Sequence, residues 1–173
     1  SVDDTCRDIS VTCIAPTKTF NLAGLQTAAV YAENSILHHR MWRQLNTDEV
    51  AEPNAFAIQA TIAAFQYGEE WLDELREYVE KNKQYVTEFL QEKIPLIHPV
   101  AGEATYLMWL DCRDLGLSNE ALHDFMIQKA KLGLNDGCAF GRSLNGYMRL
   151  NVACPRSILE QAMRQLEAAV NSL

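Results

Sequence analysis

The sequence predicts an α/β protein whose strands lie near both ends and whose middle is helical. Short segments rich in β-branched residues occur near the N-terminus, and after Pro95 the apolar period falls to two residues, as in strands. Between them, residues 69–93 repeat apolar side chains at three- and four-residue spacing, as in a helix. A chain of 173 residues is long enough for one good core, or for two small lobes that share a helix.

The composition is that of a folded protein and excludes several classes of partner. Apolar residues make up 48% and charged residues 22%, and the net charge is −8. We predict no nucleic-acid partner, because phosphates require a basic surface. No apolar run approaches the roughly 20 residues that cross a bilayer, so we expect no membrane association. Residues 1–4 resemble no signal peptide and lack an initiator methionine, which favours a cytoplasmic location and a piece of a longer protein.

The odd number and wide spacing of the cysteines argue against a disulfide framework and a zinc knuckle. We interpret them as free thiols that are buried as small apolar side chains in a reducing compartment. They are Cys6, Cys13, Cys112, Cys138 and Cys154. The four histidines are either adjacent on a predicted helix or isolated, so we predict no metal site.

Two strands are predicted within the first 31 residues. Residues 9–14 alternate and are rich in β-branched side chains, and Pro16 ends them. Residues 27–31 are small and apolar and predict a second, buried strand. Because two apolar strands do not make a stable sheet alone, we expect residues 1–30 to be frayed or to pair with strands of another chain.

Three helices are predicted between residues 34 and 93. Asn34 or Ser35 is placed to cap the first, which runs to about residue 45. Pro53 and Asn54 open the second, which runs to about residue 67. The third covers residues 69–93, and its polar face carries eight acidic and four basic residues. We interpret that face as solvated rather than as a docking surface.

Residues 94–173 are predicted to form a self-contained α/β lobe. Three strands are expected there, at residues 96–97, 105–110 and 146–153. A helix that Ser118 caps and Gly133 ends lies between them, and residues 135–137 predict a turn. A capping box of Ser157 and Glu160 starts the terminal helix.

Lys18 lies at the end of the first predicted strand, between Thr17 and Thr19 and before an apolar turn that contains Gly24. An ordinary surface lysine that leaves a sheet fits this spacing. The alternative is a desolvated amine that attacks a carbonyl and forms an imine, with the two threonine hydroxyls on a phosphate. The residues alone leave both interpretations open.

Arg149 lies inside an otherwise apolar predicted strand, residues 146–153. Burying an arginine is costly unless the guanidinium meets an anion. That anion is either an acidic side chain of the same fold or the carboxylate of a substrate, which a guanidinium binds with two parallel hydrogen bonds. Taken alone, the strand favours neither.

Together the two segments resemble the fold-type-I enzymes of the class I/II aminotransferase superfamily, which use pyridoxal 5'-phosphate (PLP). They are most similar to the branch of cystathionine β-lyase-like C–S lyases labelled MalY/PatB. In that branch a serine or threonine precedes the Schiff-base lysine, and T-F-N-x-A-G-L follows it, as in residues 17–25. The family's carboxylate-binding arginine lies in R-[IL]-N-x-x-x-P-R, as in residues 149–156, and residues 104–111 resemble its small-domain strand.

The resemblance covers essentially the whole chain and implies its domain organisation. It implies the C-terminal part of a PLP-dependent transferase fold, since members of the family are far longer. Residues 1–67 then correspond to a remnant of the large PLP-binding domain and its sheet, residues 68–93 to the connecting helix, and residues 94–173 to the small α/β domain. The full-length enzyme is expected to be a homodimer.

The resemblance also implies the site. Lys18 is expected to form the Schiff base with PLP, Thr17 and Thr19 to contact the cofactor, and Arg149 to bind the carboxylate of a small amino-acid substrate. Many aminotransferases have a phosphate-binding arginine eight residues after the lysine, where this chain has Gln26. The lyase branch commonly lacks it, which favours β-elimination to a thiol, pyruvate and ammonia. Transamination is the alternative, and a third is that these 173 residues form a folded lobe without activity.

Overall fold

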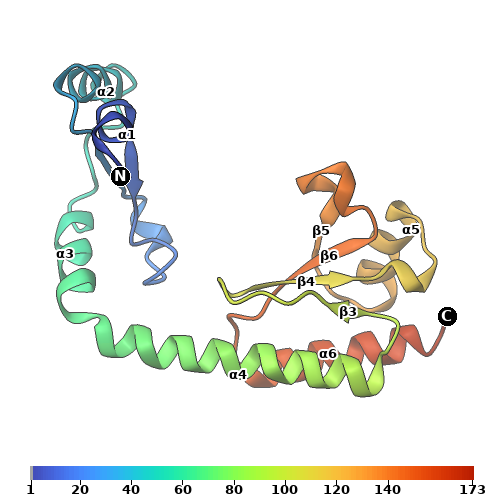
Figure 1. Ribbon diagram of the computed structural model, residues 1–173. Coiled ribbons are helices and arrows are strands. Elements are labelled where there is room, and N and C mark those ends of the chain that lie inside the picture. The colour runs from blue at the N-terminus through green and yellow to red at the C-terminus, as the bar shows by residue number, and fades with distance from the viewer. Residues whose placement is uncertain (1) are drawn as a thin grey trace. The chain divides into compact units, whose positions relative to one another are not determined.

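The structure is a computed structural model that describes residues 2–173 (Figure 1). The chain divides between Glu74 and Leu75 into two compact units. Helix α4 (Glu69–Lys93) begins in the first unit and continues through the second, with the bounds that its apolar period predicts. The predicted α/β class is confirmed, whereas the domain boundaries at residues 67 and 93 stay a prediction.

Three α-helices precede α4 among residues 2–68, besides a short 3-10 helix at Ala23–Leu25. The first, α1 (Asp4–Ile9), is not predicted by the apolar period, and the side chain of Asp3 caps it. The two predicted helices are present as α2 (Ser35–Thr47) and α3 (Ala57–Tyr67). Asn34 caps α2 as predicted, because its side-chain oxygen accepts two N–H groups of the first turn.

The strands of the first unit are short and pair with each other. β1 (Thr12–Ile14) and β2 (Ala29–Tyr31) are antiparallel, with Thr12 opposite Tyr31. The expectation that these strands fray is therefore wrong, whereas their pairing with strands of another chain stays a prediction. The predicted strand over residues 9–14 is shortened because its start belongs to α1, and the predicted burial of the second strand is wrong, because every residue of both strands is exposed.

The second unit contains a four-stranded antiparallel sheet in the order β3-β4-β6-β5. Its strands are β3 (His98–Pro99), β4 (Leu107–Asp111), β5 (Asn135–Asp136) and β6 (Tyr147–Asn151). The central strands β4 and β6 pair over five positions, and Trp109 stands opposite Arg149. Figure 1 shows the second part of α4 and the terminal helix α6 (Arg156–Val170) on one side of this sheet.

The core of the second unit lies between that side of the sheet and the helices. Alternate residues of β4 and β6 are buried, among them Leu110 and Met148, because successive side chains of a strand point to opposite faces. They pack with Val86 and Leu90 of α4 and with the apolar stripe of α6. The opposite face, which we call the open face because α4 and α6 do not cover it, carries half-buried residues of the two strands, among them Trp109, Asp111, Tyr147 and Arg149.

Two strand-and-turn predictions in the second unit are wrong. The strand expected at residues 96–97 begins only at His98, since Ile97 is buried in the core and its N–H bonds the carbonyl of Ile94. Asn135 and Asp136 do not form a turn but pair with β6. The predicted strands over residues 105–110 and 146–153 are present as β4 and β6, each with slightly different bounds.

The helix ends of the second unit follow different signals from those predicted. Ser118 caps α5 (Asn119–Asp124) as predicted. The helix then continues as one π-helical turn, and Lys131, with φ 57°, takes the left-handed position that ends it, in place of Gly133. The capping box of Ser157 is absent, because α6 begins at Arg156 and no side chain caps it.

All five cysteines are free, but their expected burial is largely wrong. Only Cys112 is buried, and burial raises the pKa of its thiol to about 12. Cys13 and Cys138 are exposed. Among the helices of residues 2–173, none is both long and apolar enough to cross a membrane.

Candidate functional site

Lys18 lies in a tight turn that follows β1. The N–H of Phe20 donates to the carbonyl of Pro16 at 2.9 Å, and the N–H of Leu22 donates to the carbonyl of Thr17 at 3.0 Å. These bonds fix the backbone on both sides of Lys18 without using its side chain. The backbone that carries the Lys18 side chain is therefore held in one conformation, while the amine itself is left free of these bonds.

Phe20 anchors this turn to the helices of the first unit. Its ring centroid lies 5.4 Å from that of Phe65 in an edge-on arrangement and 6.2 Å from that of Trp71. A Cβ at Gly68, between α3 and α4, would lie 2.7 Å from the Phe20 ring, so a glycine is needed for this approach. The aromatic contact thus holds the lysine turn against the junction of the two helices.

The side chain of Lys18 is exposed, as is Thr19, and Thr17 is half-buried. The strand before Lys18 is not buried in the described residues, because β1 is itself exposed, and a desolvated amine in the full-length protein stays a prediction. Neither the amine nor the two hydroxyls hydrogen-bond to another described residue. One free amine between two free hydroxyls is a donor set that fits a phosphate ester bearing an aldehyde.

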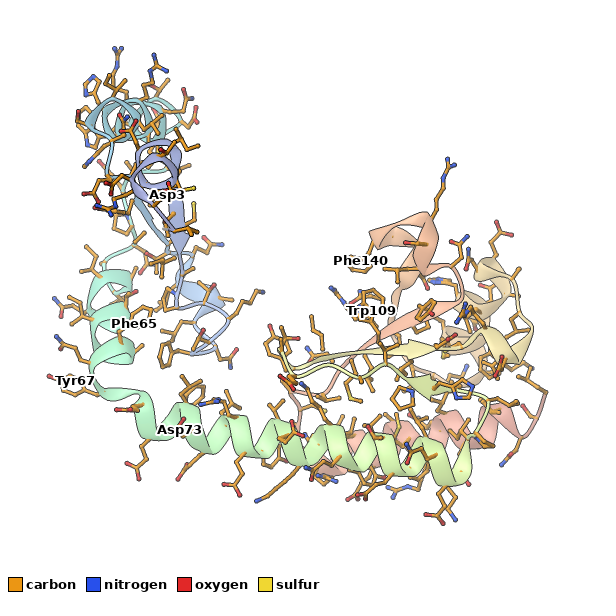
Figure 2. All side chains as sticks on the ribbon, in the orientation of Figure 1. Asp3, Phe65, Tyr67, Asp73, Trp109 and Phe140 are labelled. Atoms are coloured by element: carbon orange, nitrogen blue, oxygen red, sulfur yellow. The ribbon has the colours of Figure 1, made fainter. Side chains whose placement is uncertain are left out.

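Arg149 lies on the open face of the sheet in the second unit, where uncharged side chains hold it. Its Nη2 donates to Oδ1 of Asn135 at 3.1 Å, and its Cζ lies 4.2 Å from the centroid of the Phe140 ring. Phe140 meets the Trp109 ring edge-on at 5.4 Å, and Figure 2 shows both rings on the side of the sheet away from α4. Asn135 and Phe140 therefore orient the guanidinium without neutralising it.

The two acidic residues of the strands β4 and β5, Asp111 and Asp136, are paired elsewhere. Asp111, on the same face of the sheet, forms an ion pair with Arg113 at 2.6 Å, and hydrogen bonds from Arg113 lower the pKa of Asp111 to about 2. Asp136 pairs with His123 at 2.8 Å. Within residues 75–173 no carboxylate pairs with Arg149, and its Nε is buried without a partner. The internal ion pair considered from the sequence is not formed in this unit, so the guanidinium keeps donors for an external anion.

A cavity of about 960 Å³ lies between α4 and the chain of residues 95–109, and both Arg149 and Trp109 line it. The buried Lys83 also lines it, and its Nζ lies 3.5 and 3.4 Å from the carbonyl oxygens of Gly102 and Ala104. Arg149 therefore borders a space that is large enough for a small molecule.

Sequence reasoning identifies Arg149 but misses the residues that hold it. Asn135 belongs to a segment that reads as a turn, and Phe140 follows it without a motif. The strand period of residues 107–111 places Trp109 on the face opposite the buried Met108, which is the one signal that the sequence offers. The structure places Lys18 in the first unit and Arg149 in the second.

Comparison with known proteins gives consistent results. The model of the family described as aminotransferase class I and II matches residues 7–166. Cystathionine beta-lyase PatB of Bacillus subtilis is 39% identical over 99% of this chain and 44% of its own length. Cystalysin of Treponema denticola, which contains PLP, superposes with a TM-score of 0.95 at 28% identity over 99% of this chain and 44% of that chain.

A third relative is also a PLP-containing protein that this chain matches over only part of its length. The PLP-bound C–S lyase of Staphylococcus hominis superposes with a TM-score of 0.79 at 28% identity, over 94% of this chain and 42% of that chain. The chain thus spans less than half the length of each of these relatives.

Proposed function

Because the chain belongs to the class I and II aminotransferase family, we propose that it is part of a PLP-dependent C–S β-lyase. The substrates would be small cysteine S-conjugates such as cystathionine. The observation that carries this proposal is the guanidinium of Arg149, which is oriented by Asn135 and Phe140 but paired with no carboxylate in its unit. The names of the C–S lyase relatives support the same reaction class.

In this proposal Lys18 holds the cofactor, and the hydroxyls of Thr17 and Thr19 contact it. The free amine between two free hydroxyls supports this assignment. PLP, when bound, supplies the electron sink that stabilises negative charge at the substrate Cα. The amine of Lys18, when free, accepts the proton from Cα.

Arg149 binds the substrate carboxylate with two parallel hydrogen bonds and so fixes the direction of the Cα–H bond. When the Cα proton leaves, the C–S bond at Cβ breaks and its electron pair departs with the sulfur as a thiolate. Addition of water then gives pyruvate and ammonia. Every atom of the substrate is accounted for by the thiol, pyruvate and ammonia together with that water.

Transamination is the second candidate, because the matching family is named for aminotransferases. We propose a homodimer and a cytoplasmic location for the whole enzyme, the latter supported by five free cysteines. We also propose that these 173 residues alone do not catalyse the reaction, since Lys18 is exposed in the described chain.

The deciding experiment gives L-cystathionine to the full-length protein and measures pyruvate, thiol and keto acid. Equimolar pyruvate and thiol support the lyase. A keto acid that retains the carbon skeleton, with the cofactor left in its amino form, supports the transaminase. After unbound PLP is removed by gel filtration, the full-length protein should retain a yellow absorbance band and this chain alone should not.

Lys18→Ala in the full-length protein should abolish both elimination and the borohydride-stable attachment of PLP, because an imine requires a primary amine. Lys18→Arg should fail as well, since a guanidinium stays protonated. Lys93→Ala, at an exposed lysine of α4, is the matched control and should keep both. A borohydride-stable adduct in the Lys18→Ala variant would refute the assignment.

A further inference from the structure

Asn82 of α4 is completely buried, in a unit whose interior is otherwise apolar apart from Lys83. A buried amide costs stability unless its donors and acceptor are used. Here all are used. Its Nδ2 donates to the carbonyl oxygens of Val152 and Cys154 at 2.9 and 3.0 Å, and its Oδ1 accepts the Nε–H of Arg156 at 3.0 Å.

Arg156 extends the same attachment. Its Nη2 donates to the carbonyl of Lys81 at 2.7 Å, and its own backbone N–H donates to the hydroxyl of Tyr78 at 2.7 Å. Its guanidinium lies 4.6 Å from the centroid of the Tyr85 ring. Residues from nearly two turns of α4 therefore contact Arg156.

These contacts reach the segment that directly follows β6. Val152 is buried, its carbonyl is held by Asn82, and its N–H donates to the carbonyl of Tyr106 at 3.0 Å. Arg149 is only three residues earlier, within β6. Because a shift of one residue along a strand moves each side chain to the other face, the position of Val152 sets which face Arg149 takes and how far along the sheet it stands.

We propose that Asn82 and Arg156 are positioning residues for Arg149: they fasten the chain after β6 to α4 and so set where the guanidinium stands on the open face. This inference rests on the proposed function, in which Arg149 binds the substrate carboxylate. It also gives a role to Arg156, the second arginine of the motif R-[IL]-N-x-x-x-P-R.

The test compares S-ethyl-L-cysteine with its carboxamide in the full-length enzyme and follows the release of ethanethiol from both. Asn82→Asp places a carboxylate oxygen against two carbonyl oxygens, and Arg156→Lys loses the hydrogen bond to Asn82. Each should raise KM for the carboxylate substrate by about tenfold, with kcat changed less, because misplacement by a fraction of an ångström weakens a two-point contact. KM for the carboxamide should stay unchanged, since an amide does not use the paired charge of Arg149.

Two further variants separate positioning from general stability. Val86→Ala removes a buried contact of the same helix but none of these hydrogen bonds, so it should lower the thermal midpoint without changing either KM. Tyr78→Phe removes only the hydroxyl that accepts the backbone N–H of Arg156, so it should raise KM for the carboxylate substrate by less than about tenfold. This variant provides the test if Asn82→Asp does not fold.

Arg149→Gln is run beside them. If it abolishes the preference for the carboxylate substrate and the Asn82, Arg156 and Tyr78 variants do not reduce it, the positioning role is wrong and the proposed function stands. Equal KM changes for the two substrates, or a KM change in Val86→Ala, would also overturn the positioning role. If Arg149→Gln keeps the preference, both the carboxylate assignment and this inference fall.

Discussion

Leu110 and Leu166 in the second unit are completely buried, whereas Trp42 and Phe56 in the first are 58% and 75% exposed. The difference is general. Among residues 75–173 a continuous apolar core joins α4, the sheet and α6, while among residues 2–74 only Pro16, Ala32 and Ala57 are buried. Since apolar burial is the main favourable term in folding, the two units should differ sharply in the stability that each has alone.

The largest expected effect separates the two units. A fragment of residues 68–173 should unfold in one cooperative transition, because it contains the whole of α4 and the complete core. A fragment of residues 2–67 should show no cooperative transition. Urea titration followed by circular dichroism, together with the dispersion of amide NMR signals, measures both. A cooperative transition in the fragment of residues 2–67 would contradict the expected difference in stability between the two units.

Matched isoleucines test the same contrast within the chain. Ile94 is 1% exposed and Ile58 is 56% exposed. Ile94→Ala should lower the free energy of unfolding by about 2–5 kcal/mol, because it removes buried methyl groups and leaves a cavity. Ile58→Ala should stay within about 0.5 kcal/mol of the unchanged chain. Chemical denaturation of both variants gives the values, and similar losses at the two positions would contradict the burial described.

The ion pair between Asp111 and Arg113 makes the stability of the second unit depend on pH. The pKa of Asp111 is lowered from 3.8 to about 2, so its ion pair with Arg113 stabilises the second unit above pH 4 and ceases to do so as the pH falls through 2. After allowance for the exposed arginine, Asp111→Asn should cost about 1 kcal/mol at pH 7. The gap between the two proteins should close between pH 4 and pH 2 in urea titrations. A gap independent of pH would show that the carboxylate acts by its shape alone.

The smallest effect compares two serines that both read as helix caps. Ser118→Ala should cost about 0.5–1 kcal/mol, because Ser118 accepts the N–H of Ala121 at 3.2 Å. Ser157→Ala should cost less than about 0.3 kcal/mol, since no side chain caps α6. Thermal unfolding of the two variants side by side decides the matter. Equal losses of stability in the two variants would show that Ser157 does cap α6, as the capping box predicts.

The helices were the most predictable part of the fold. The apolar stripe of residues 69–93 gives the bounds of α4, and Asn34 marks the start of α2, because both signals lie within one or two turns of the chain. Strand ends depend on partners that are distant in sequence. Asn135 is a strand residue only because β6 supplies its hydrogen bonds, so its local turn signal is overridden.

The candidate site divides in the same way. Lys18 and Arg149 are recognisable from motifs of adjacent residues, although their roles stay proposals. Phe140 and Asn135 reach Arg149 only through the pairing of β5 with β6, and Asn82 reaches Val152 across the interior of the unit. No spacing within the sequence encodes such contacts, so they could not be predicted.

The pairing of β4 with β6 has a consequence for synthesis on the ribosome. Leu107–Asp111 must wait for Tyr147–Asn151 before its central ladder can close. At the usual rate of elongation, the 35 intervening residues take about 2–7 s to make. During that interval β4 lacks its central hydrogen-bonding partner, and the nascent chain displays an unpaired strand edge. The time window in which a chaperone is most useful to this chain is therefore defined by a single antiparallel ladder.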